Sequence, residues 1–100
     1  MAPINAAEFI ARINNGESVN LLDVREEIEY STYNIGGVNL PLSVIPEHIT
    51  RLPYNKTDEI VVICKIGMRS ETARQILNDN GYNNARNLSG GLMALQKLTR

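Results

Sequence analysis

The clearest structural signal in the chain is the stretch Ile60-Val61-Val62-Ile63-Cys64-Lys65-Ile66-Gly67-Met68-Arg69-Ser70. Its first four residues are apolar and β-branched, which is typical of a strand covered on both faces of a parallel sheet. A helix is predicted from about Arg69 to Asn80, because apolar residues recur there at helical spacing and Gly81 follows as a stop signal. The stretch therefore predicts a buried strand that turns tightly into a helix.

The segments before this strand alternate between helical and strand-like patterns. Asn5 and Glu8 have the spacing of a capping box. Apolar residues then recur at helical spacing and predict a first helix: Ala6, Phe9, Ile10 and Ile13. A short strand is predicted at 21–24, a brief helix at 26–31 and a weak strand at 38–40. Three prolines, at 41, 46 and 53, predict an irregular segment in the middle of the chain.

The segments after the helix at 69–80 continue the alternation. Residues 85–88 predict a last strand, and Gly90-Gly91 precedes a final helix that carries three leucines at helical spacing. No internal repeat or linker interrupts the sequence, so residues 1–100 are predicted to form one α/β domain, with helices on both sides of a mostly parallel sheet. Ligands bind at the carboxyl ends of the strands in such sheets, which points to the residues after Ile63.

Composition narrows the function classes. The 100 residues are 43% hydrophobic and 21% charged, with a formal net charge of −1, as expected of a soluble globular protein. The near-neutral charge gives no basic surface that would predict nucleic-acid binding. No apolar run approaches the roughly 20 residues of a membrane helix. The N-terminus lacks a secretory-signal pattern. One cysteine gives neither an internal disulfide nor a metal site of clustered thiols, so we expect a cytoplasmic protein without a metal or cofactor.

The loop after the buried strand has the features of an anion site around Cys64. Gly67 permits the backbone angles of a tight curl, and a curled loop that leads into a helix directs several N–H groups inward. Lys65 and Arg69 add two cations. Such surroundings lower the pKa of a cysteine from about 8.5 to roughly 3.5–7.5 and make the thiolate available as a nucleophile. The alternative is that Cys64 is a small buried hydrophobic residue, and the loop residues alone leave both interpretations open.

Two charged residues lie at the end of the neighbouring predicted strand. Asp23 is expected to support the structure at the strand end, by an ion pair or by accepting backbone N–H groups. Arg25 has two open interpretations, a structural ion pair or recognition of an anionic substrate, since arginine matches the geometry of oxyanions. Ser70 is expected to cap the following helix or to donate to the thiolate.

Four segments together resemble the signatures of a rhodanese homology domain. They are Leu22–Glu26 with Glu29-Tyr30, Ile35–Pro41, Cys64–Ser70, and Gly81-Tyr82 with Leu88–Gly91. The resemblance covers nearly the whole chain, with the segments in the family's order and spacing. It implies a three-layer α/β/α fold around a mostly parallel five-stranded sheet.

The resemblance also implies an activity. Cys64 would take the outer sulfur of a donor such as thiosulfate as a persulfide and pass it to a thiophilic acceptor, such as cyanide or a thiol. Arg69 would hold the loop closed and Lys65 would attract an anionic donor. The expected substrate-binding residues are Lys65, Ile66, Gly67, Met68, Ser70 and Arg25. A protein sulfur carrier is a further expected partner, and the expected state is a monomer or weak dimer.

Two other functions occur in related domains. Non-catalytic rhodanese-like modules bind partners, but they commonly lack the cysteine that this chain retains. Phosphatases and arsenate reductases have a loop one residue longer than the four residues that separate Cys64 from Arg69 here. The chain departs from the family pattern at Tyr33-Asn34, where Gly-His is common, and in having no tryptophan near Ala94.

Overall fold

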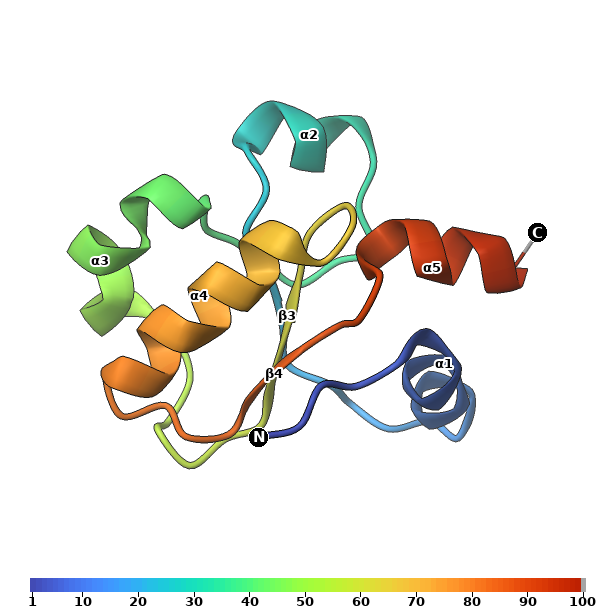
Figure 1. The fold of residues 1–100 in the computed structure, drawn as a ribbon, viewed down its shortest axis with the longest axis horizontal. Helices are drawn as coiled ribbons and strands as arrows, with labels where there is room; N and C mark the ends of the chain where they lie inside the picture. The colour runs from blue at the N-terminus through green and yellow to red at the C-terminus, as the bar shows by residue number, and fades with distance from the viewer. Residues whose placement is uncertain (100) are drawn as a thin grey trace.

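The computed structural model describes residues 1–99, and within them a parallel sheet lies between two layers of helices (Figure 1). The strands are β1 (Leu21–Asp23), β2 (Val38–Asn39), β3 (Ile60–Ile63) and β4 (Ala85–Asn87). The α-helices are α1 (Ala6–Asn14), α2 (Glu27–Thr32), α3 (Ile45–His48), α4 (Met68–Asp79) and α5 (Gly91–Thr99). Two 3-10 turns, Leu42–Val44 and Ile49–Arg51, flank α3. The irregular middle predicted from the prolines is thus a series of short helical turns.

The sheet has the strand order β2-β1-β3-β4, and each neighbouring pair is parallel. All four residues of β3 are completely buried, because strands cover both of its edges and helices cover both of its faces. This confirms the buried strand predicted at residues 60–63. Cys64 follows at the carboxyl end of β3, and α4 begins four residues later.

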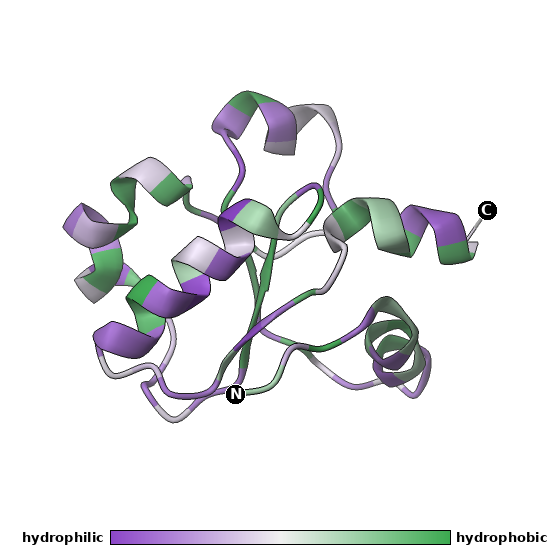
Figure 2. Ribbon diagram, viewed as in Figure 1, coloured by the Kyte–Doolittle hydropathy of each residue, from purple (hydrophilic) through white to green (hydrophobic). Residues whose placement is uncertain are grey.

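Alternate residues of β3 belong to two separate apolar cores. Ile60 and Val62 face the core beneath α3 and α4, whereas Val61 and Ile63 face the core beneath α1 and α5. Figure 1 shows these two helix pairs on opposite sides of the strands, and Figure 2 shows β3 as an apolar strand between them. The period of two along β3 is the side-chain alternation of any strand, so the predicted three-layer α/β/α architecture is confirmed.

The number of strands differs from the prediction. In residues 1–99 the sheet has four strands rather than five, and beside β4 lies only an isolated bridge between Ile4 and Leu88. Pro3 has no N–H to continue a ladder, and Asn5 already caps α1 by accepting the backbone N–H of Glu8 at 2.7 Å. One residue is therefore left for pairing, and a fifth strand cannot extend.

No helix within residues 1–99 combines the length and the apolar character needed to cross a membrane.

Candidate active site

The loop after β3 wraps around the sulfur of Cys64. Gly67 has a φ of 98°, in the left-handed region that favours glycine, and its backbone N–H therefore turns back and donates to Sγ at 3.1 Å. Ser70, in the first turn of α4, donates its own backbone N–H to Sγ at 3.4 Å. The Ser70 hydroxyl lies 3.2 Å from the same sulfur. The segment that was predicted to curl does so around Cys64.

The pKa of Cys64 is set by opposing effects. Burial of the residue, which is 0% exposed, raises the pKa. Hydrogen bonds from the Ser70 hydroxyl and from the backbone N–H groups of Ser70, Gly67 and Ile66 lower it, and together they outweigh burial. The pKa of the thiol is therefore below its ordinary value, the direction that favours a thiolate.

The start of α5 holds the other side of the loop. The backbone N–H of Leu92 donates to the carbonyl of Cys64 at 2.9 Å, and that of Met93 donates to the carbonyl of Lys65 at 3.0 Å. Gly91 makes this approach feasible, because a Cβ there would lie 2.5 Å from both carbonyl oxygens. The start of the last helix is thus a backbone clamp on the loop.

Arg69 contacts α2 rather than the sulfur. Its guanidinium donates two hydrogen bonds to the Glu29 carboxylate, at 2.6 and 3.0 Å. The Arg69 guanidinium lowers the pKa of Glu29 to about 2, and the same carboxylate raises the pKa of Arg69. Glu29 also accepts the backbone N–H of Glu26 at 3.0 Å and so caps α2. Arg69 therefore joins the first turn of α4 to α2.

Asp23 and Arg25 form a buried ion pair beside the loop. The Arg25 Nε and Nη2 atoms lie 3.0 and 2.8 Å from the two Asp23 carboxylate oxygens. Arg25 Nη2 also donates to the carbonyl of Tyr33 at 2.7 Å, and Asp23 accepts the backbone N–H of Arg25 at 3.0 Å. These bonds fit the structural interpretation of both residues. Recognition of an anion by Arg25 stays a prediction.

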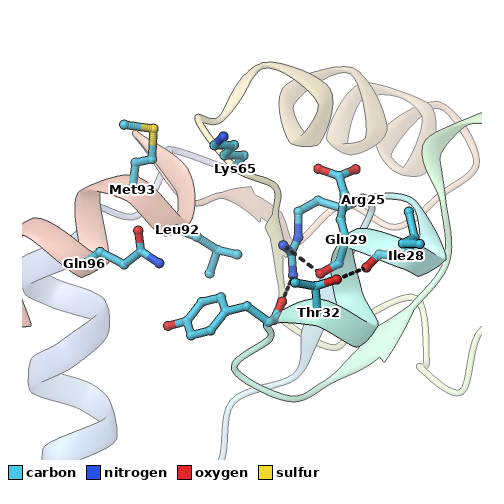
Figure 3. Close-up of a pocket in the computed structure, with 9 residues that line it drawn as sticks. Arg25, Ile28, Glu29, Thr32, Lys65, Leu92, Met93 and Gln96 are labelled. Carbon is cyan, nitrogen blue, oxygen red and sulfur yellow. Dashed lines mark hydrogen bonds between the residues drawn. The ribbon is translucent and has the colours of Figure 1, made fainter.

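A pocket of about 380 Å³ opens between α2, the loop and the start of α5 (Figure 3). Its lining residues are Arg25, Ile28, Glu29, Thr32, Tyr33, Lys65, Leu92, Met93 and Gln96. Among the predicted loop residues, Gly67 and Ser70 contact the sulfur and Lys65 lines this pocket. Ile66 and Met68 instead have exposed side chains, at 51% and 72%.

No group of three or more side chains of the metal-ligating types lies together anywhere in residues 1–99.

The family model described as "Rhodanese-like domain" matches residues 5–98. The chain belongs to this family. The rhodanese-like resemblance found in the four sequence segments is thereby confirmed, and so is the α/β fold class.

Relatives and solved structures agree with the rhodanese-like assignment. The chain is 36% identical over 90 residues to "Putative sulfur carrier protein YrkF" of Bacillus subtilis, covering 89% of this chain and 48% of that protein. It is 32% identical over 92 residues to a sulfurtransferase of Allochromatium vinosum, covering 91% of this chain and 84% of the other. A crystal structure of the protein SSP1007 from Staphylococcus saprophyticus superposes with a TM-score of 0.84 at 32% identity, covering 95% and 93% of the two chains. The chain spans less than half the length of the first curated relatives it matches.

The rhodanese-like site contains two residues that were not predicted as site residues. Glu29 belongs to the first of the four family-like segments, and its partner Arg69 is 40 residues away. Asn87 is a buried polar residue on β4, whose side chain contacts both Ser70 and Gly67. In the sequence, Asn87 stands between Arg86 and Leu88 in the predicted strand, on the same face as Ala85, and a buried polar group of this kind is hydrogen-bonded.

Proposed function

We propose that the chain is a sulfurtransferase in which Cys64 carries sulfur as a persulfide. The observation that carries the proposal is the set of hydrogen bonds that Gly67 and Ser70 make with Cys64 Sγ. They compensate for burial and lower the pKa of the thiol, as a sulfur nucleophile requires. Sulfurtransferases among the relatives support the same class of reaction.

The reaction has two balanced steps. The Cys64 thiolate attacks the outer sulfur of thiosulfate, an S–S bond forms at Cys64, and the S–S bond of thiosulfate breaks to release sulfite with the electron pair. The Cys64 persulfide anion is then attacked at its outer sulfur by cyanide or a thiolate. Thiocyanate or a new persulfide leaves, and Cys64 returns as the thiolate.

Hydrogen bonds would stabilise each anionic state of this cycle. The backbone N–H groups of residues 65–69, together with Ser70, would surround the persulfide, and those of Gly67 and Ser70 donate to Sγ. Charge-assisted hydrogen bonds of this kind are the stronger class. Lys65, at the pocket beside the loop, would attract an anionic donor by its charge. Arg69 would keep the loop closed through Glu29.

The short loop supports sulfur as the transferred group. Four residues separate Cys64 from Arg69, one fewer than in the phosphatase and arsenate-reductase branch that the sequence resembles less well. The proposal includes sulfur donors other than thiosulfate. It also includes a protein sulfur carrier as acceptor, because one relative is named a putative sulfur carrier protein.

Intact-protein mass spectrometry tests the proposal. After incubation with thiosulfate, the unmodified protein should gain one sulfur atom, about 32 Da, and lose it again on addition of cyanide or a thiol. Cys64→Ser should show no gain and no thiocyanate production. The proposal fails if the protein gains no sulfur from thiosulfate or a small-molecule persulfide, or if Cys64→Ser transfers sulfur as fast.

A further inference from the structure

A chain of buried hydrogen bonds runs from Cys64 through Ser70 to Asn87. The Ser70 hydroxyl lies 3.2 Å from Cys64 Sγ and 2.5 Å from Asn87 Oδ1. Asn87 Nδ2 then donates to the carbonyl of Gly67 at 3.0 Å, back in the loop. Cys64 and Ser70 are 0% exposed and Asn87 is 8% exposed. The single hydroxyl proton of Ser70 therefore lies between two possible acceptors, Cys64 Sγ and Asn87 Oδ1.

The direction of these hydrogen bonds follows from the chemistry of the groups. The Gly67 carbonyl can only accept, so the side-chain atom of Asn87 that faces it must be the amide nitrogen. Asn87 Oδ1 then faces Ser70, and because Oδ1 also can only accept, the Ser70 hydroxyl donates its single proton to it. Ser70 is left with lone pairs directed at Cys64 Sγ. That arrangement suits a protonated S–H, which can donate to Ser70.

An anionic sulfur needs the opposite arrangement. A thiolate or a persulfide anion accepts hydrogen bonds, so the Ser70 hydroxyl must rotate toward the sulfur to donate. Asn87 Oδ1 would then lose its donor in a buried position, which is unfavourable because an unpaired buried acceptor keeps its full desolvation penalty. Asn87 and the anionic sulfur therefore compete for the same proton.

We propose that Asn87 is a positioning residue that holds the Ser70 hydroxyl turned away from Cys64 while the sulfur is protonated and releases it when the sulfur becomes anionic. The inference rests on the proposed function, since the thiolate and the persulfide anion are the states that sulfur transfer uses. Asn87 thereby favours the resting thiol, and the anionic states keep the backbone donors of Gly67 and Ser70.

The charged groups around Cys64 are independent of this chain of hydrogen bonds. They are Arg69 on α4, the Asp23 and Arg25 pair at the end of β1, Glu29 on α2, and Lys65 in the loop. β4 and α5 present the uncharged Asn87, Leu92 and Met93 to the loop. Substitutions at positions 87 and 70 leave all of these charges in place, so a change in the pKa of Cys64 can be attributed to the hydroxyl.

A double-mutant cycle on the pKa of Cys64 tests the inference. The pKa is measured from the pH dependence of alkylation by iodoacetamide in the unmodified protein, Asn87→Leu, Ser70→Ala and the double variant. Asn87→Leu changes the pKa of Cys64 by one amount when Ser70 is present and by another when Ser70 is replaced by Ala. We expect the first change to be lower than the second by about one pKa unit, because the freed Ser70 hydroxyl then donates to the thiolate. In the Ser70→Ala background, Asn87→Leu removes only the hydrogen bond to the Gly67 carbonyl, so the pKa of Cys64 should stay the same or rise.

The cycle also separates the inference from a merely structural role. If Asn87 only braces the loop, Asn87→Leu shifts the pKa equally with and without Ser70, and the inference is overturned. A Ser70-dependent shift to higher pKa overturns it too. If Asn87→Leu does not fold, Asn87→Ala enters the same cycle with the same expected sign. Alkylation needs no sulfur donor, so a failure of persulfide formation and a failure of this cycle are distinguishable.

Discussion

The reactivity proposed for Cys64 depends more on backbone geometry than on the two cations nearby. Lys65 is exposed, and Arg69 is about one-third exposed and paired with Glu29. Solvent and the carboxylate therefore weaken the field that each cation exerts on the sulfur. The groups that lower the pKa of Cys64 are the Ser70 hydroxyl and the N–H groups of Ser70, Gly67 and Ile66. The left-handed conformation of Gly67 is what turns its N–H toward Sγ.

A second glycine gives a prediction about the backbone around the loop. An alanine in the left-handed conformation costs about 1–2 kcal/mol. Gly91→Ala should lower the free energy of unfolding by more than this amount. Its Cβ would lie 2.5 Å from the carbonyl oxygens of Cys64 and Lys65, so the backbone must also shift. Urea denaturation measures the loss.

Gly16→Ala is the matched control for this prediction. Gly16 has a similar positive φ of 82°, but a Cβ there meets nothing within 4 Å. Gly16→Ala should therefore show the strain alone, and Gly91→Ala should be less stable than it by about 1 kcal/mol or more. Equal losses in the two variants would contradict the clamp that α5 makes on the loop.

Three elements hold the loop at the scale of secondary structure. Glu29 of α2 binds Arg69, Asn87 of β4 binds the Gly67 carbonyl, and the first N–H groups of α5 bind the carbonyls of Cys64 and Lys65. Each contact comes from a different direction, so the loop is fixed although it contains no regular structure. Functional geometry of this kind needs support from packed elements around it.

The contact between α2 and α4 gives a prediction for Glu29→Gln. The ion pair with Arg69 is about one-third exposed on each side, so after solvent screening we expect a loss of about 0.5–1 kcal/mol in stability at pH 7. The rate of sulfur transfer should fall several-fold, because the start of α4 is no longer held to α2. Glu71→Gln breaks the ion pair between Glu71 and Arg74 within α4. It should cost similar stability and leave the rate of sulfur transfer unchanged. Equal rates in both variants would exclude the role given to Glu29.

The same ion pair should show a defined pH dependence. The pKa of Glu29 falls from an ordinary 4.5 to about 2 in the folded state. A carboxyl with a lowered folded pKa stabilises the protein above its unfolded pKa, and that stability is lost as pH falls through the folded value. The stability difference between the unmodified protein and Glu29→Gln should therefore be full above about pH 5 and shrink between pH 4.5 and 2. Urea denaturation at pH 7, 4 and 2.5 measures it, and a constant difference would refute the assignment.

The elements that local patterns determine were predictable from the sequence. The apolar run of β3 and the helical spacing of α4 each depend on neighbouring residues, and both predictions are confirmed. The contacts of the loop were harder to predict, because Arg69 and Glu29 are 40 residues apart and Asn87 is 20 residues from Gly67. The fifth strand was expected from the family and is reduced to a bridge by the local effects of Pro3 and Asn5. The spacing of neighbouring residues does not predict which residues far apart in the sequence will contact one another.

Over the whole molecule, the two ends of the sheet carry different polar networks. The carboxyl ends of the strands carry Cys64 and its loop. At the opposite end, Glu59 lies just before β3 and accepts hydrogen bonds from Arg12 of α1 at 3.0 Å and Arg86 of β4 at 3.3 Å. Hydrogen bonds from Arg12, followed by those from Arg86, hold the pKa of Glu59 below its ordinary value. This network joins the first helix to the edge strand, and Cys64 lies roughly 16 Å away along the strand.

Glu59→Gln should therefore weaken the molecule without affecting sulfur transfer. Glu59 is three-quarters buried and shared by two arginines, so its charge loss should cost about 1–2 kcal/mol in the free energy of unfolding at pH 7. Its rate of sulfur transfer should stay within about two-fold of the unmodified protein, since distant sites with no shared partners act independently. Glu29→Gln is the comparison, because it removes one arginine-paired carboxylate at the other end of the sheet and should lose rate with little stability. If Glu59→Gln lost rate as Glu29→Gln does, the loop would depend on the whole sheet rather than on the three elements that contact it.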